Sequence, residues 1–595
     1  MQLITIVLFS AVVLLIAYRV YGTILSRWLK LRADVATPAV ALRDEVDFVP
    51  IDAKFLMGQH FSAIAAAGPI VGPILAGLTF GWLPALIWIL LGSIFIGGVH
   101  DMTSLVASIR HKARSIAEVV RDHMNRRSYI LFLMFVWLAL VYIIVAFTDI
   151  TARAFIGKQV LDNGEEITGG GIASSSLMYL ILPLIMGCLL RFTKMGVGLA
   201  TAIFLPLVGV SIVAGQWMPF DIGQIFNLTD AETLRVWNVS LLVYCVIASV
   251  LPMWLLLQPR GHLGGFFLYI ALGAGMLGVI FGGKEIAYPA FRGWSVAAAD
   301  GSTLTLFPLM FIMIACGACS GFHSIIASGT TSKQLRSEPD ARVIGYGAML
   351  LEAMVAVVSL CCVMMLAPDS NLLVGQPKPN NIYAQGIGSF MQVFGIPAAF
   401  GVSFGLMAFT TFIYDTLDVC TRLGRYILQE LLGWQGSLGR WFATAFTAGV
   451  PMIFLIWQPT GTGKPAWLIF WELFGASNQL LAALTLLGVT VWLAKTMQAR
   501  WVWFAVGLPC VFMYVMSMWA LFRICWPLLV SIKSFSISLA QGSPTWEGAK
   551  GNPVPWVASI LIALGLMMLV EALRVVKGGW SSPEPTVDGK VAATA

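Results

Sequence analysis

The chain has 595 residues, of which 58% are hydrophobic and only 11% are charged. A soluble globular chain is about a quarter charged, so this composition indicates an all-α polytopic membrane protein with the bilayer as its solvent. The formal net charge of +7 does not argue for a nucleic-acid partner, because the basic residues gather in loops on one face of the predicted topology.

The amino-terminal segment is apolar first and basic afterwards, which is the reverse of a signal peptide, so we expect a retained helix that begins outside. About fifteen apolar stretches are long enough to span a bilayer. They lie at residues 3–25, 55–77, 82–109, 128–156, 176–191, 195–215, 236–257, 263–283, 305–328, 343–366, 393–421, 441–458, 466–493, 501–525 and 555–575.

The distribution of basic residues supports this map. If the first stretch begins outside and every stretch spans, most of the 36 lysines and arginines fall in inside loops, including the run RHKARSIAEVVRDHMNRR at 110–127 and the short loop 258–262. Inside loops of membrane proteins carry such an excess. The amino terminus is therefore predicted to lie outside and the carboxyl terminus in the cytoplasm.

After the first helix, the chain divides into two runs of seven stretches with opposite orientation. This indicates an inverted repeat, the arrangement of many transporters. We expect a helix and cytoplasmic linker at 1–54, a first repeat at 55–283, a second repeat at 305–575 and a short cytoplasmic tail at 576–595.

Each run opens with a helix interrupted by glycines. The sequences are AAAGPIVGP, with Gly68 and Gly72, and ACGACSGFHS, with Gly317 and Gly321. Close helix packing is the simplest reading of a lone GxxxG. Because Pro69 accompanies the first motif and both fall at matching points, discontinuous helices that expose backbone groups to a substrate are favoured here.

The third helices of the two runs carry similar polar strings, AFTDITARAF and AFTTFIYDTLDVCTRL. Charges at membrane depth are costly, so each one is a candidate site. The candidates for ion or proton coupling are Asp149, Thr410, Thr411 and Asp415.

Arg422 and Arg425 closely follow Asp415 and Asp418 and are candidates to pair with them. For Asp418, a structural ion pair therefore competes with an ion-binding role. No lysine or arginine is expected at the predicted midplane. Glu352 and Glu472 are also predicted to lie inside the membrane. Each is a candidate either for a proton carrier or for a hydrogen-bonded packing residue.

Histidines gather in the inner halves of their predicted helices. They are His60, His100 (which precedes Asp101) and His323. An Asp–His pair can hold and pass a proton near neutral pH, so a gate or proton path is one interpretation. The other interpretation is that these histidines cap helix ends. Their spacing does not indicate a structural metal site.

The nine cysteines all fall in apolar segments, which does not match a disulfide framework. Cys316 and Cys319 form a CxxC that suits metal or redox chemistry, but buried packing is favoured because no second CxxC accompanies it. We expect no metal, no cofactor and no catalytic residue.

Several long stretches resemble the carbon starvation protein A family. They are GQHFSAIAAAGPIVGPILA, GWLPALIWILLGSIFIGGVHDMTSL, ACGACSGFHSIIASGTTSKQL, TLDVCTRLGRYILQELLG and WELFGASNQLLAALTLLGVTVWL, and the resemblance covers about residues 1–530. The resemblance implies a bacterial inner-membrane protein for nutrient uptake, related to the amino acid–polyamine–organocation superfamily. The core of that superfamily is an inverted repeat of five helices, the first of each being broken.

By the same resemblance, a substrate site is expected at the two breaks and an ion site between the first broken helix and the helix of Thr410, Thr411 and Asp415. The implied substrate-binding residues are Ala66, Gly68, Pro69, Ile70, Gly72, Cys316, Gly317, Ser320 and Gly321.

Three functions are open at this point. The first is a symporter, driven by protons or by sodium, for a small carboxylate such as pyruvate, because backbone N–H groups at a broken helix suit a carboxylate. The second is a transporter of short peptides. The third is a membrane sensor or enzyme. The sequence does not indicate an oligomeric state.

Overall fold

The computed structural model describes residues 2–44, 48–160, 165–252, 254–297, 303–373, 375, 378–434, 436–457, 465–540 and 552–577. The predicted tail after residue 577 lies outside these ranges. The helices up to residue 281 are α1 (Leu3–Trp28), α2 (Pro38–Ala41), α3 (Ala53–Ile64), α4 (Gly68–Phe80), α5 (Trp82–Gly92), η1 (Ser93–Gly97), α6 (Gly98–Arg110), α7 (Ile116–His123), α8 (Arg126–Ala154), α9 (Gly169–Phe192), α10 (Val197–Trp217), α11 (Ile222–Phe226), α12 (Asp230–Val250) and α13 (Leu257–Phe281).

The later helices continue in the same order. They are α14 (Leu306–Met313), α15 (Phe322–Gly329), η2 (Thr331–Lys333), η3 (Glu338–Asp340), η4 (Arg342–Gly347), α16 (Ala348–Met364), η5 (Asn371–Leu373), α17 (Pro379–Gln392), α18 (Ala398–Leu432), α19 (Ser437–Trp457), α20 (Ala466–Met497), η6 (Trp503–Gly507), α21 (Leu508–Ala540) and α22 (Val554–Lys577).

The described chain is an all-α bundle that crosses the membrane many times. Thirteen of its helices are long and apolar enough to span, and the bent pair α3–α4 makes fourteen. The remaining expected stretch, 305–328, folds as the two short helices α14 and α15. The prediction of a polytopic helical membrane protein is confirmed, while the orientation, the domain boundaries and the inverted repeat stay predictions.

Two short β-hairpins connect helices, one between α8 and α9 and the other between α13 and α14. Strand β1 (Lys158–Val160) pairs antiparallel with β2 (Glu166–Thr168), and β3 (Ser295–Ala297) pairs with β4 (Thr303–Thr305). Both hairpins fall in loops that the predicted orientation places outside.

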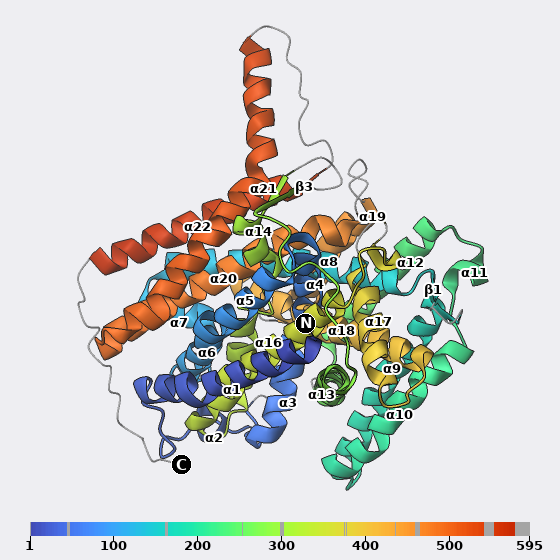
Figure 1. Ribbon diagram of the computed structural model, residues 1–595. Coiled ribbons are helices and arrows are strands. Elements are labelled where there is room, and N and C mark those ends of the chain that lie inside the picture. The colour runs from blue at the N-terminus through green and yellow to red at the C-terminus, as the bar shows by residue number, and fades with distance from the viewer. Residues whose placement is uncertain are drawn as a thin grey trace.

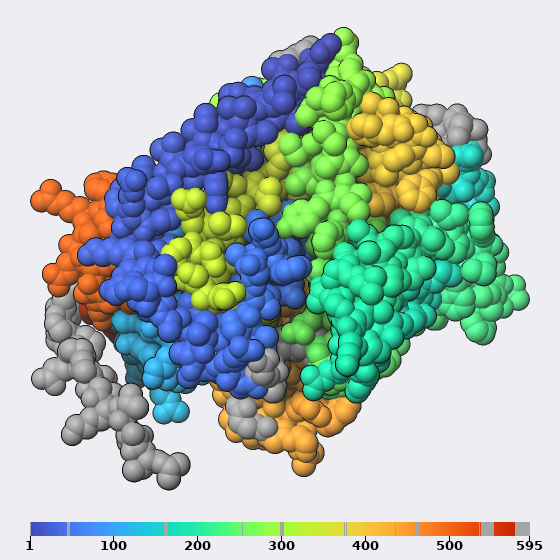
Figure 2. Space-filling view, turned by 90° about the horizontal axis from the view of Figure 1, so that it is seen from below, coloured from blue at the N-terminus to red at the C-terminus, as the bar shows by residue number. Residues whose placement is uncertain are grey.

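The long helix α8 packs against both α18 and α20 inside the bundle (Figure 1). Helices α9 and α10 pair at one side, and α21 and α22 pack against α20 at another. Helix α1 lies on the surface beside α13 (Figure 2). The broken pair α3–α4 packs against α13, α16 and α18, while α14 and α15 pack against α20.

One predicted loop is wrong. Residues 258–262 were expected to connect two spans on the inside, but they form the first turn of α13. Their proline, arginine and histidine lower the local hydropathy, so the segment looks like a loop. A proline near a helix start costs no hydrogen bond, and Arg260 is neutralised by partners that are distant in sequence.

Candidate functional site

The two helix breaks contact each other inside the bundle. Helices α3 and α4 are bent by 48° at residues 65–67, and residues 314–321 separate α14 from α15. A Cβ on Gly68 would lie 2.3 Å from the Sγ atom of Cys316, so only glycine permits this contact. A Cβ on Gly317 would lie 3.7 Å from the Cα atom of Pro69.

All of the residues predicted to bind substrate are therefore buried in or beside these breaks. They are Ala66, Gly68, Pro69, Ile70, Gly72, Cys316, Gly317, Ser320 and Gly321.

The first break lies before Gly68, and not between Gly68 and Gly72 as predicted. Helix α4 begins at Gly68 and carries Pro69 in its first turn, where the missing N–H of proline is not needed. Pro73 is accommodated inside α4. No side chain caps this helix start. Pro69 has no N–H, and the N–H groups of Ile70 and Val71 donate to the Ala67 carbonyl at 3.1 and 2.8 Å.

The second break is supported by neighbouring helices. The Oδ1 atom of Asn478 in α20 accepts a hydrogen bond from the Phe322 N–H at 3.0 Å, and its backbone carbonyl accepts one from Gly321 at 3.1 Å. Trp88 donates its indole N–H to the Ile314 carbonyl at 3.3 Å, and Gln479 donates to Phe311. Backbone groups freed inside a membrane need such partners. Sequence analysis did not predict this role for Asn478 and Gln479.

A chain of buried imidazoles and carboxylates lies beside the second break. Asp101 accepts from the Nδ1 atoms of His100 and His323, each at 2.7 Å. The Nε2 atom of His323 lies 3.2 Å from Glu352 Oε2. All four side chains are fully buried and come from α6, α15 and α16. The structure therefore brings together three residues of the predicted gate or proton path and adds Glu352.

His60, the remaining member of that prediction, has a different partner. Its Nδ1 atom lies 2.9 Å from the hydroxyl of Thr331. In the described part of the chain, the Nε2 atoms of His60 and His100 and the Oε1 atom of Glu352 are buried without a hydrogen-bond partner. Such groups are rare in folded proteins, so these positions are suited to an exchangeable proton or to water.

A second charged cluster surrounds Arg260, which is fully buried. Its Nε atom lies 2.5 Å from Asp415 Oδ1, and its Nη1 atom contacts the Asp418 carboxylate. Tyr244 donates to Asp418 at 2.8 Å, and Ser62, just before the first break, donates to Asp415 at 2.9 Å. Sequence analysis did not predict that an arginine would pair with these aspartates, because Arg260 falls in the first turn of α13, which was expected to be a loop.

The predicted partners of these aspartates are also wrong. Arg422 donates to the backbone carbonyls of Ala248 and Leu251, both at 2.7 Å. The Arg425 guanidinium lies over the Tyr426 ring at 4.4 Å. Arg422 thus bonds the end of α12, Arg425 contacts its neighbour within α18, and the counter-charge of the aspartates is Arg260.

The predicted coupling residues do not form one cluster. Asp149 accepts from the Trp467 N–H at 2.9 Å, which caps α20, and from Arg153 Nε at 3.0 Å. The Thr410 hydroxyl lies 3.2 Å from that of Ser176. The hydroxyl of Thr411 is buried without a partner in the described chain. Asp415 belongs to the separate Arg260 cluster.

The buried CxxC contributes to packing and hydrogen bonding. Cys316 lies 3.7 Å from the Ser320 hydroxyl and 3.4 Å from the Asn478 amide, and both Cys316 and Cys319 are free thiols. Among the described residues, no group of three or more histidine, cysteine, aspartate or glutamate side chains is arranged to hold a metal ion.

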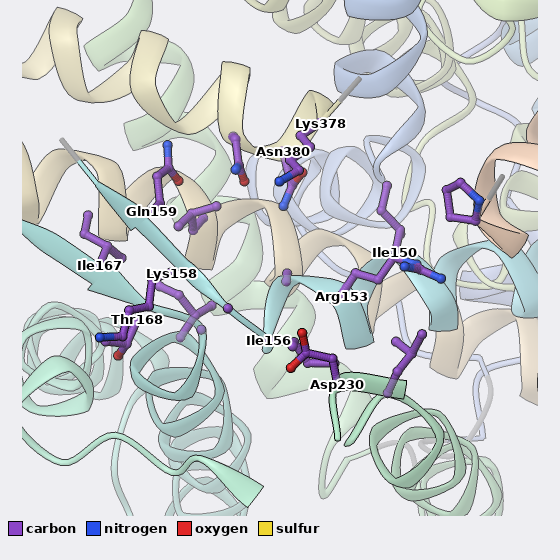
Figure 3. Close-up of a pocket in the computed structure, with 18 of the residues that line it drawn as sticks. Ile150, Arg153, Ile156, Lys158, Gln159, Ile167, Thr168, Asp230, Lys378 and Asn380 are labelled. Carbon is purple, nitrogen blue, oxygen red and sulfur yellow. The ribbon is translucent and has the colours of Figure 1, made fainter. Parts of the chain in front are cut away.

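Two cavities lie toward opposite ends of the predicted spans. One, of about 580 Å³, lies between the end of α8, the β1–β2 hairpin and the start of α17, and it is lined by Arg153, Gln159 and Lys378 (Figure 3). The other, of about 490 Å³, lies between α7, α15 and the inner half of α18, and it is lined by Lys333 and Arg422. Basic side chains line both cavities.

A bundle of spanning helices with two apposed breaks and buried charges beside them is the architecture of a multi-pass membrane transporter. Residues 2–378 and 370–520 match the family model described as Carbon starvation protein CstA. The chain belongs to this family, as its resemblance predicted.

Curated relatives span nearly the whole chain. A Bacillus subtilis protein named peptide transporter CstA is 29% identical over 99% of this chain and 100% of its own length. A Campylobacter jejuni protein of the same name is 32% identical over 85% of this chain and 78% of its own. An Escherichia coli protein named pyruvate/proton symporter BtsT is 31% identical over 87% of this chain and 81% of its own length. The chain is thus a transporter of the CstA family.

Among solved structures, a mutant of the Eremococcus coleocola manganese transporter covers 90% of this chain and 99% of its own, with a TM-score of 0.41 and 13% identity.

Proposed function

We propose that this chain is a proton-coupled symporter that takes up a small carboxylate such as pyruvate across the bacterial plasma membrane, with its amino terminus outside. The observation that carries the proposal is the fully buried chain His100–Asp101–His323–Glu352 beside the second helix break. Imidazoles and carboxylates in contact can take up and release a proton near neutral pH. The E. coli relative named as a pyruvate/proton symporter fits this reading.

The site beside the first break favours a proton over sodium as the coupling ion. The predicted ion site lay between the first broken helix and the helix of Asp415. The guanidinium of Arg260 occupies this region and bonds both Asp415 and Asp418. A permanent positive charge there repels a second cation. We therefore assign the binding of the coupling proton to the chain His100–Asp101–His323–Glu352.

The contact between the breaks limits the space in which a substrate can bind. Gly68 meets Cys316, and a Cβ on Gly72 would lie 2.3 Å from the carbonyl oxygen of Met313. A methyl group does not fit between these segments, so the segments have to separate before they can hold a substrate. No side chain caps the start of α4, so the positive end of its dipole is available to a carboxylate.

Uptake of short peptides is the second candidate. The B. subtilis and C. jejuni relatives are named as peptide transporters, and the cavity of about 580 Å³ is large enough for a dipeptide.

Uptake into proteoliposomes tests both candidates. Purified protein is reconstituted and given an inward proton gradient, with labelled pyruvate or a labelled dipeptide outside. Accumulation of pyruvate that stops when an ionophore collapses the gradient, and that does not need sodium, is the expected result. Failure of pyruvate to accumulate under the gradient refutes the proposal, and accumulation of the dipeptide alone establishes the second candidate.

A further inference from the structure

The residues that line the cavity at the β1–β2 hairpin do not include any of those at the two helix breaks, 65–67 and 314–321. Its walls come from the end of α8, the two strands, the first turn of α17 and the first turn of α20 (Figure 3). All of these segments fall at the outer ends of the predicted spans. A solute that approaches from outside reaches this cavity before it reaches the breaks.

Positive charge dominates the lining. Arg153, Lys158 and Lys378 line the cavity with a single carboxylate, Asp230, which lies across the cavity from Lys378 (Figure 3). Lys158 is paired with Glu166 at 2.8 Å. Within the described residues, Lys378 makes no ion pair. Arg153 is paired with Asp149 at 3.0 Å through its Nε atom. The Lys378 ammonium is therefore the lining cation that we assign to a ligand.

One lining side chain lacks any partner. Gln159 in β1 is only 9% exposed, and neither its amide nitrogen nor its amide oxygen has a hydrogen-bond partner among the described residues. A buried amide without partners is costly, and most such groups in folded proteins are satisfied. Because this amide lines a cavity with a free cation, a ligand with both acceptor and donor atoms would satisfy it.

We propose that this cavity is an outer binding subsite for the carboxylate end of a small solute. The Lys378 ammonium serves as its counter-ion, and the Gln159 amide bonds its neighbouring carbonyl or amide group. The inference rests on the proposed function only in taking the transported solute to be a carboxylate. A 2-oxo acid and the carboxyl end of a short peptide share this chemistry.

The test uses a reporter cysteine, Asn381→Cys, in the full chain reconstituted in liposomes without any ion gradient. Asn381 lines the cavity and is partly exposed. Its rate of modification is measured with impermeant anionic and cationic methanethiosulfonates, and the parent chain reports the background of native cysteines. Pyruvate, dialanine and dialanine amide are then added as competitors.

Lys378→Gln is expected to lower the ratio of anionic to cationic labelling rates about threefold, the effect of one charge a few ångströms from the reporter. Arg235→Gln, which removes an exposed charge from α12 outside the cavity lining, is the matched control and leaves the ratio unchanged. Gln159→Leu is expected to abolish protection by the competitors while the ratio stays at its parent value.

Protection by pyruvate and dialanine, without protection by dialanine amide, supports the subsite. Protection by dialanine alone also supports it and restricts the ligand to peptides. Equal protection by the amide, or no protection by either carboxylate, overturns it. Because no gradient is applied, this result is independent of whether protons drive uptake.

Discussion

Replacing Arg260 by methionine is expected to destabilise the bundle, because two carboxylates then lose their counter-charge inside it. Arg260 has no exposed surface, and it contacts both Asp415 and Asp418. Methionine keeps much of the volume of the side chain, so the change in stability reports the charge rather than a cavity.

The magnitude follows from the geometry. Two unit charges about 4 Å apart attract by about 4 kcal/mol at an effective dielectric constant of about 20. The cost of desolvating the ions offsets part of this in the intact cluster, but removal of one partner leaves the other charges buried and unpaired. Such variants lose about 3–5 kcal/mol. We expect Arg260→Met to lose stability in this range.

Thermal unfolding in detergent, followed by size-exclusion chromatography of the heated protein, measures the effect. Arg422→Met is the matched control, since Arg422 is also buried but bonds only backbone carbonyls, and it should lose about 1–3 kcal/mol. The triple variant Arg260→Met, Asp415→Asn, Asp418→Asn should recover most of the stability. A single Arg260→Met variant as stable as the parent would refute the reasoning.

Three further predictions concern the breaks, the proton chain and the inner rim. Gly68→Ala places a methyl group 2.3 Å from the Cys316 sulfur, so we expect uptake to fall at least about tenfold at normal expression. Adding Cys316→Gly should restore part of the uptake. Undiminished uptake by Gly68→Ala would contradict the contact. Glu352→Gln should abolish gradient-driven accumulation but keep exchange at equal pH, whereas equal loss of both would indicate a role in folding. Burial and the neighbouring His111 ring lower the pKa of His123 to about 4 from its usual 6.5. Between these two pH values the unfolded chain binds more protons than the folded chain. The free energy of unfolding should therefore fall as the pH is lowered from 6.5 toward 4. At pH 5.5 the loss should be about 1 kcal/mol after allowance for partial exposure, and His123→Gln should melt with less dependence on pH.

The spans and the two breaks could be predicted from sequence because their signals are local. Long apolar runs are required by the thickness of the bilayer, and glycine or proline changes the backbone where it stands. The His100–Asp101 and His323 positions were also found, since charge at membrane depth is expensive wherever it occurs. The exact break could not be placed, because Pro69 is as well suited to starting a helix as to interrupting one.

The missed features depend on partners far along the chain. Arg260 looks like part of a loop until Asp415 and Asp418, about 155 residues later, are seen to neutralise it. Asn478 is an ordinary polar residue until α20 packs against the second break, where it meets freed backbone groups. Hydropathy and motif spacing carry no information about such pairings.

Each half-helix beside a break is tethered to a different kind of charge cluster. Ser62, two residues before the end of α3, bonds the Asp415 carboxylate that Arg260 holds. His323, at the start of α15, bonds Asp101 and faces Glu352. A guanidinium keeps its charge at every accessible pH, whereas an imidazole and a carboxylate exchange protons. A proton arriving at the breaks is therefore expected to change the bonds that hold α15, while the bond from Ser62 of α3 to Asp415 stays the same; in α3, the His60–Thr331 bond is the one that a proton could change. In a symporter built on this plan, proton binding would act first on the second broken helix.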